Sequence, residues 1–308
     1  MSSLKGKDII SAFDFERNDL LRLFELAEEL RKEIASKGTL DYAKGKVMIT
    51  AFFEPSTRTK ISFQFAMTRL GGLVIDFIEE VSSLKKGETE EDTMRILDGY
   101  GPDVIVVRHS RPFFPHSVRD FVRAPIISGG DGTNEHPTQA LLDVYTMWRE
   151  FGRVDGLTVG VMGDLKYGRT IPSLSYMLTR FNDITIYYIA PKQLQVREEV
   201  IKKVEGKLNY HLVENVEEVI EKLDVLYVTR LQKERFEDQQ EYERLKGSYV
   251  ITRSLLERHK KIPIIMHPLP RVWEITTDVD SLPQAKYFEQ AQNGMYVRAA
   301  LLKEILGV

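Results

Sequence analysis

The chain has 308 residues, which exceeds one typical hydrophobic core and predicts about two domains, and its 43% hydrophobic and 29% charged residues are typical of a soluble globular protein. The net charge of −3 argues against a general nucleic-acid or anionic-membrane surface, and the absence of cysteine excludes disulfides, thiolate nucleophiles and Cys-ligated metals. No apolar run reaches membrane-spanning length, and the first residues lack the apolar core of a signal peptide, so we expect a cytoplasmic enzyme.

The first half of the chain alternates helical and strand-like segments. An apolar stripe at helical spacing covers residues 19–37 and ends at Gly38, where a helix C-cap is common. Buried strands are then predicted at residues 47–53, 73–78, 103–107 and 124–127, and helices at residues 59–70, 90–97 and 137–148. Such alternation is typical of a parallel sheet that is covered by helices on both faces.

A second series of segments begins after residues 150–155. It predicts strands at residues 157–162, 184–189, 225–228 and 262–266, with helical stretches between them. We therefore predict an α/β protein with two doubly wound parallel-sheet domains, residues 1–150 and residues 151–289. The periodicity of the closing segment predicts a long amphipathic helix but does not say which domain it joins, and we assign residues 290–308 to the first.

Two hydroxyls, an arginine and a third hydroxyl follow the first predicted strand, as Ser56, Thr57, Arg58 and Thr59. They open a predicted helix, whose free N–H groups and dipole favour an anion. A guanidinium at this point adds a planar fork that can bind two phosphate oxygens. An ordinary N-cap is the alternative, but capping requires only one of these residues and no arginine in the first turn. The run therefore favours a phosphate-type anion site.

Other polar clusters come directly after predicted strands or open predicted helices. They lie at residues 108–110, 136–139, 163–170, 229–232 and 267–271. Taken singly, an arginine after a strand is usually a solvated charge, and a histidine is usually a satisfied polar group. Their recurrence at equivalent positions of one architecture indicates a shared site. The turn at residues 163–168 lacks the spacing of a dinucleotide-binding loop, so we do not predict NAD binding.

Several of these motifs resemble those of the aspartate/ornithine carbamoyltransferases, and the resemblance extends over essentially the whole chain. Residues 53–59, Phe-Glu-Pro-Ser-Thr-Arg-Thr, and residues 136–139, His-Pro-Thr-Gln, match motifs of the whole family. Residues 163–169 and 229–235 resemble the aspartate branch. His-Pro-Leu-Pro at residues 267–270 replaces the His-Cys-Leu-Pro motif of ornithine enzymes. The resemblance thus favours aspartate as the acceptor.

The resemblance implies positions that bind carbamoyl phosphate. They are Ser56, Thr57, Arg58 and Thr59 at the phosphate, Arg108 and His136 with Thr59 at the carbonyl oxygen, and Gln139 with the backbone around Leu269 and Pro270 at the NH₂ group. Among them, Arg58, Thr59, Arg108 and His136 are the expected catalytic residues, together with Lys86.

The resemblance also implies positions that bind aspartate and close the two domains. Arg169 and Arg230 would bind the two carboxylates, with help from Gln232, and Lys86 would enter from a neighbouring subunit of a homotrimer. The loop before Lys86 is one residue shorter than the family pattern, so either Ser82 or Ser83 would accompany it. Glu54 is expected to pair with Arg169 and Arg235 on closure, and Glu241 with Lys166 or Tyr167 in the open state.

The implied reaction is attack of an amine on the carbonyl carbon of carbamoyl phosphate, an early step of de novo pyrimidine biosynthesis. It involves no redox change, so we expect no cofactor and no metal. His136 suits a hydrogen-bond donor to the developing oxyanion, because the leaving phosphate can accept the amine proton. A carbamoyltransferase for ornithine remains the nearest alternative. A non-catalytic anion-binding protein on the same scaffold is a second alternative.

The family also suggests a further partner, a zinc-bearing regulatory chain in an allosteric holoenzyme. Residues 111–116 contain the adjacent aromatics Phe113 and Phe114 between two prolines. We expect at least one of them to be exposed on the lone catalytic trimer and buried by that partner. The alternative is that both side chains pack inside the first domain.

Overall fold

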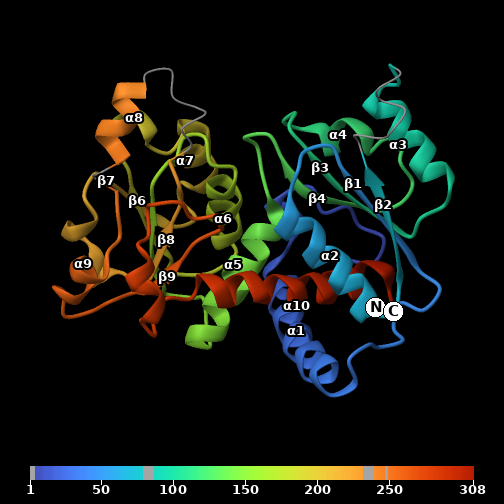
Figure 1. The fold of residues 1–308 in the computed structure, drawn as a ribbon, viewed down its shortest axis with the longest axis horizontal. Coiled ribbons are helices and arrows are strands. Elements are labelled where there is room, and N and C mark those ends of the chain that lie inside the picture. The colour runs from blue at the N-terminus through green and yellow to red at the C-terminus, as the bar shows by residue number, and fades with distance from the viewer. Residues whose placement is uncertain (1–3, 79–86, 232–238, 247–248) are drawn as a thin grey trace. The chain divides into compact units, whose positions relative to one another are not determined.

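The computed structural model describes residues 4–78, 87–231, 239–246 and 249–308. The chain divides into two compact units, of which unit 1 comprises Met1–Tyr145 with Gln292–Val308 and unit 2 comprises Thr146–Ala291. Both are built on parallel sheets, which confirms the predicted α/β fold (Figure 1). Helices α5 (Pro137–Phe151) and α10 (Tyr287–Leu306) each cross the boundary between the two units.

Unit 1 contains a four-stranded sheet in the order β2-β1-β3-β4. Its strands are β1 (Val47–Phe52), β2 (Leu73–Ile78), β3 (Val104–His109) and β4 (Ile126–Asp131). The unit also holds η1 (Ala12–Asp14), α1 (Arg17–Lys37), α2 (Thr57–Arg69), α3 (Glu90–Gly99) and α4 (Phe114–Val118). The inner strands β1 and β3 are apolar and buried, as the continuous hydrophobic runs predicted.

The carboxyl-terminal part of α10 belongs to unit 1, where it lies beside α1 (Figure 1). Arg22 forms an ion pair with Glu304 at 2.6 Å, and Arg31 donates to the amide oxygen of Asn293 at 2.6 Å. The fourth strand is longer than the sequence predicted, because β4 continues past residue 127 to Asp131.

Unit 2 contains a five-stranded sheet in the order β7-β6-β5-β8-β9. Its strands are β5 (Thr158–Met162), β6 (Thr185–Ile189), β7 (Asn209–Val213), β8 (Val225–Val228) and β9 (Ile264–Met266). Its helices are α6 (Thr170–Leu178), α7 (Glu198–Val204), α8 (Gln239–Lys246) and α9 (Arg253–Glu257), with short turns η4 (Lys192–Leu194), η5 (Val216–Glu218), η6 (Ile220–Lys222) and η8 (Thr277–Ser281). The sequence pattern did not predict β7, which is a largely exposed edge strand without an apolar run.

Each sheet has a point where the strand order reverses direction. In unit 1 this point lies between β1 and β3, and in unit 2 it lies between β5 and β8. Ligands of doubly wound folds bind beyond the carboxyl ends of the strands at such a point. The loops that leave these four strands carry four of the motifs that the sequence singled out, at residues 56–59, 108–110, 163–170 and 229–232. The topology thus places these four motifs where such folds commonly bind ligands.

Candidate active site

The Ser56–Thr59 run forms the start of α2, directly beyond β1. Ser56 has an extended backbone, with φ −157° and ψ 103°, and its side chain makes no capping hydrogen bond. Arg58 is exposed, whereas Thr59 is buried at 6% exposure. A hydroxyl that does not cap its own helix, next to an exposed guanidinium and unpaired first-turn N–H groups, is suited to an anion. The N-cap alternative therefore does not account for this turn.

Three of the predicted residues converge beyond β1, β3 and β4. The hydroxyl of Thr59 lies 3.4 Å from Nε2 of the buried His136, and Arg108 donates from Nη1 to the carbonyl of Gly129 at 2.9 Å. Gly130 makes this possible, because a Cβ there would lie 3.2 Å from both Arg108 and His136, and its φ is +109°. The cluster therefore brings a hydroxyl, an imidazole and a guanidinium close together.

Glu54 lies beside this cluster, with Oε2 at 3.0 Å from Nε of Arg108. The resemblance had assigned Glu54 to Arg169 and Arg235, and residue 235 lies outside the described residues. The contact with Arg108 was not foreseen from the sequence. An anion that binds Arg108 will compete with this carboxylate, so ligand binding and release of Glu54 are linked.

The side chain of Gln139 is oriented by a carboxylate one turn further along α5. Its Nε2 donates to Oδ1 of Asp143 at 2.8 Å, and both residues are buried. An ionised carboxylate can only accept, so the NH₂ group of Gln139 faces Asp143 and its oxygen remains an acceptor. This is the polarity needed to receive an NH₂ group from a ligand. Asp143 was missed by the sequence reasoning, although its i, i+4 spacing from Gln139 on a helix is a usable signal.

In unit 2, the loops after β5 and β8 lie against each other. Gly163 has φ +122°, and a Cβ there would lie 2.3 Å from the carbonyl oxygen of Thr229. Asp164 is fully buried and accepts from the backbone N–H of Tyr167 at 3.0 Å, which shapes the loop before α6. These two loops carry Arg169 and Arg230, both half-buried. The fold therefore brings together the loops of the two arginines that were predicted to bind carboxylates.

The segment after β9 is held by a buried histidine and glutamate. Nε2 of His267 lies 2.7 Å from Oε1 of Glu274, and Nδ1 of His267 accepts from the N–H of Leu269 at 2.7 Å. Leu269 has φ +54° and precedes Pro270 through a cis peptide bond. Burial by itself would raise the pKa of Glu274, but the hydrogen bonds from His267 and the backbone hold that pKa below its usual value. Glu274 was not identified from the sequence.

Some predicted residues cannot be placed. Ser82, Ser83, Lys86, Gln232 and Arg235 lie outside the described residues. The side chain of Glu241 likewise lies outside the described side chains, so its expected pairing with Lys166 or Tyr167 stays a prediction. Among the residues that the structure describes, no three His, Asp or Glu side chains are grouped to hold a metal ion, and no helix could cross a membrane.

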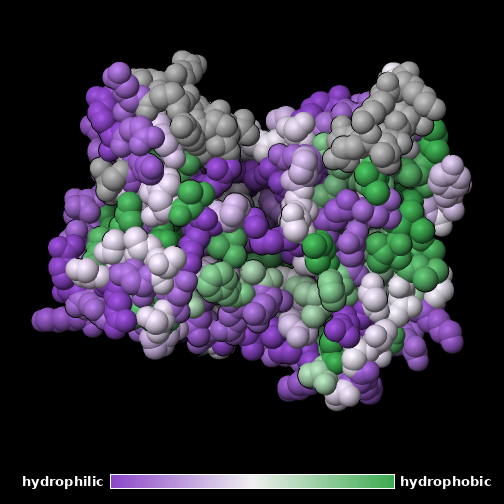
Figure 2. Space-filling view, viewed as in Figure 1, coloured by the Kyte–Doolittle hydropathy of each residue, from purple (hydrophilic) through white to green (hydrophobic). Residues whose placement is uncertain are grey.

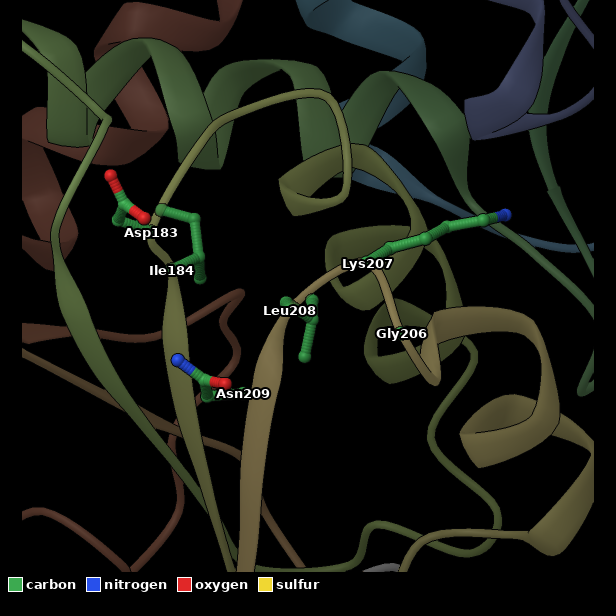
Figure 3. A pocket seen from close by; sticks show the side chains of 6 residues that line it. All are labelled: Asp183, Ile184, Gly206, Lys207, Leu208 and Asn209. Atoms are coloured by element: carbon green, nitrogen blue, oxygen red, sulfur yellow. The ribbon is translucent and has the colours of Figure 1, made fainter.

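A cavity of about 300 Å³ lies elsewhere in unit 2 (Figure 3). Its lining runs through residues 183–184 and 206–209, at the amino ends of β6 and β7. The predicted site residues lie at the opposite, carboxyl ends of the strands. The cavity is therefore separate from the candidate site.

Comparison with known proteins identifies a family over nearly the whole chain. Two family descriptions match: "Aspartate/ornithine carbamoyltransferase, carbamoyl-P binding domain" over residues 7–149, and "Aspartate/ornithine carbamoyltransferase, Asp/Orn binding domain" over residues 155–305. The aspartate carbamoyltransferase catalytic subunit of Pyrobaculum calidifontis is 52% identical over 305 residues, which is 98% of each chain.

Solved structures give the same result. The aspartate transcarbamoylase of Trypanosoma cruzi in complex with carbamoyl phosphate is 42% identical, with a TM-score of 0.94 over 99% of this chain and 97% of that chain. The same enzyme has been solved with carbamoyl phosphate and aspartate together, at a TM-score of 0.94 and 42% identity over 99% of this chain and 98% of that chain. The catalytic subunit from M. jannaschii is 45% identical, with a TM-score of 0.90 over 98% of each chain.

Proposed function

The chain belongs to the aspartate/ornithine carbamoyltransferase family, and we propose that it transfers the carbamoyl group of carbamoyl phosphate to the amine of L-aspartate. The products are N-carbamoyl-L-aspartate and phosphate. One observation carries the proposal: the phosphate-type turn at Ser56–Thr59 and the cluster of Thr59, Arg108 and His136 both lie at the strand-order reversal of unit 1. The proposal assigns the reaction to de novo pyrimidine biosynthesis in the cytoplasm.

The chemistry follows from the donors of this cluster. The aspartate amine attacks the carbonyl carbon, and negative charge develops on the former carbonyl oxygen. Phosphate then leaves as the bond between its oxygen and this carbon breaks. In this proposal Thr59, Arg108 and His136 donate to the former carbonyl oxygen, and each such donor contributes about 2.7–4 kcal/mol in other acyl-transfer sites. The contact of Thr59 with His136 supports the assignment. The leaving phosphate accepts the amine proton, so His136 acts as a donor and not as a base.

The acceptor is aspartate and not ornithine. Arg169 and Arg230 lie on the two adjoining loops after β5 and β8, where two guanidinium groups suit two carboxylates. A cationic side chain would be repelled there. Orientation of the amine by such a pair supplies up to about 7–11 kcal/mol in favourable intramolecular cases. The direct test is phosphate release from carbamoyl phosphate with aspartate or with ornithine, and a faster rate with ornithine would overturn the assignment.

We extend the proposal to a homotrimer, because unit 1 has an exposed apolar face along the edge strand β2 and the neighbouring α2. Figure 2 shows apolar residues gathered over this part of unit 1. Its members are Ile61, Phe65, Leu73, Ile75 and Ile78, which are 45–59% exposed. An apolar face of this kind on an edge strand favours burial against another chain. A second copy is the occupant we propose, since β2 leads directly into the segment that contains Lys86.

A shared site has a specific consequence. If Lys86 completes the site of a neighbouring subunit, Lys86→Ala and Arg58→Ala chains are each inactive alone. Mixed trimers of the two chains should regain activity, because some of their sites receive both intact residues. Well-mixed hybrid trimers without activity would show that the sites are not shared.

We also propose a zinc-bearing regulatory chain as a partner in an allosteric holoenzyme, docking at Phe113. Phe113 is 58% exposed with φ +62°, whereas Phe114 is fully buried against Phe53 and His109. The exposure of Phe113 on the single chain supports this residue, and not Phe114, as the docking residue. The N–H of Phe113 donates to the buried Asp131 at 2.7 Å, which fixes the backbone of this exposed aromatic.

A further inference from the structure

Behind Gln139 lies a buried arginine with little hydrogen bonding of its own. Arg298, on α10, is 3% exposed and donates from Nη1 to the hydroxyl of Ser62 at 2.6 Å. Its Nε and Nη2 are buried and have no hydrogen-bond partner among the described residues. Burial lowers the pKa of Arg298, and the negative charge of Asp143 acts in the opposite direction. Asp143 is therefore the anion that offsets this buried cation.

The packing of α10 on α5 leaves room for this guanidinium. A Cβ on Gly294 would lie 2.9 Å from Nη1 of Arg298 and 3.0 Å from the side chain of Leu142. A larger residue at this position would therefore crowd both the guanidinium of Arg298 and the side chain of Leu142. Leu142 and Asp143 are consecutive on α5, so the arginine lies close to the turn of α5 that carries the carboxylate.

Resting on the proposed function, we propose that Asp143 and Arg298 together are positioning residues that select the carbamoyl group through Gln139. Arg298 supplies a positive charge close to Asp143, the carboxylate of Asp143 accepts from Nε2 of Gln139, and the amide oxygen of Gln139 is thereby left to accept from the NH₂ group of the substrate. A neutral partner at residue 143 can donate as well as accept, so it permits the reversed amide. In the reversed orientation, the NH₂ group of Gln139 faces the NH₂ group of the substrate, and two donors cannot form a hydrogen bond. The reversed amide therefore disfavours the carbamoyl group.

Acetyl phosphate measures this selection, because it has a methyl group in place of the NH₂ group and is otherwise similar in shape. A site built to accept a hydrogen bond from NH₂ binds the analogue that lacks it more weakly. The ratio of the dissociation constants of acetyl phosphate and carbamoyl phosphate, measured by calorimetry, therefore reports the orientation of Gln139. General damage to the site weakens both ligands alike and leaves the ratio unchanged.

The experiment compares the parent with Asp143→Asn, Gln139→Ala and the double variant. We expect Asp143→Asn to reduce the ratio by about tenfold, the size of one hydrogen bond to a neutral group. We expect no further reduction when it is added to Gln139→Ala, because the residue it acts through is gone. Asp41→Asn, an exposed aspartate of unit 1, is the matched control and should retain the parent ratio.

Each outcome decides one question. If the parent does not bind carbamoyl phosphate, the proposed function is wrong. If the parent discriminates and Asp143→Asn discriminates equally well, or if the double variant shows two additive losses, only the positioning role is wrong. If Asp143→Asn does not fold, Arg298→Met serves as the second variant, because it removes the positive charge close to Asp143. We expect it to lower the ratio of the two dissociation constants as well. An unchanged ratio in Arg298→Met would refute the proposal.

Discussion

Replacement of Glu274 by glutamine should destabilise unit 2 strongly, because the buried carboxylate of Glu274 is the acceptor in each of its hydrogen bonds. Its Oε1 accepts from His267, its Oε2 accepts from the N–H groups of Val272 and Trp273, and His267 in turn accepts from Leu269. Glutamine has one acceptor and one NH₂ group, so in either orientation a donor faces a donor. The side chains of both Glu274 and His267 are 1% exposed, which excludes rescue by solvent.

The magnitude follows from this count of broken bonds. A buried donor left without an acceptor costs about 1–3 kcal/mol, and a hydrogen bond to a charged group contributes about 1.5–3 kcal/mol. We therefore expect Glu274→Gln to lower the free energy of unfolding by about 2–4 kcal/mol. Glu257→Gln is the control: this exposed glutamate pairs with Arg253 at 2.7 Å, and such pairs contribute about 0–1 kcal/mol.

Tryptophan fluorescence is a suitable assay for unit 2. The chain has 2 tryptophans, Trp148 and Trp273, and both lie in unit 2. Their fluorescence during urea unfolding thus reports on unit 2. The unfolding of unit 1 is followed by a separate measurement. A loss below about 0.5 kcal/mol, no larger than that of an ordinary surface substitution, would refute the directional argument.

The effect of Glu274→Gln should also depend on pH. The folded-state pKa of Glu274 is lowered, so its stabilising contribution is full above the unfolded pKa, near the usual value of 4.5, and is lost as the pH falls through the folded pKa. Glutamine does not titrate. The difference in stability between the parent and the variant should therefore shrink as the pH falls below that value, and a difference that stays constant would contradict this linkage.

Three further predictions concern ligands and partners. Arg58→Ala should abolish carbamoyl phosphate binding in calorimetry, whereas Arg230→Ala should retain it and impair aspartate use; loss of binding in both would contradict the division of roles. Phe114→Ala should cost about 3–5 kcal/mol of stability as a fully buried aromatic, whereas Phe113→Ala should leave stability within about 0.5 kcal/mol and weaken binding of the regulatory chain. A bisubstrate analogue should compact the parent in small-angle scattering, and Glu54→Ala should diminish that compaction; a parent profile unchanged by the analogue would exclude closure.

Much of the candidate site is encoded locally and was predictable from the sequence. The strand–turn–helix at residues 47–69 depends on an apolar run, on residues that favour a helix start, and on helical spacing, all within a short segment. The same holds for Arg108 and Arg230, which follow apolar strands directly. Since parallel strands end at a common edge of their sheet, a correct sequence of elements was enough to place these residues at the carboxyl ends of their strands, where such folds commonly bind ligands.

Long-range polar pairing was decided only by the tertiary structure. The Glu54–Arg108 ion pair, the Arg298 guanidinium beside α5 and the close packing over Gly294 join segments that are distant in the chain. Local patterns cannot predict them, because a buried charge selects its partner from whichever elements pack against it. The edge strand β7 was missed for a related reason: its pairing with β6 supplies the backbone hydrogen bonds, while its side chains remain largely exposed and leave no apolar signal.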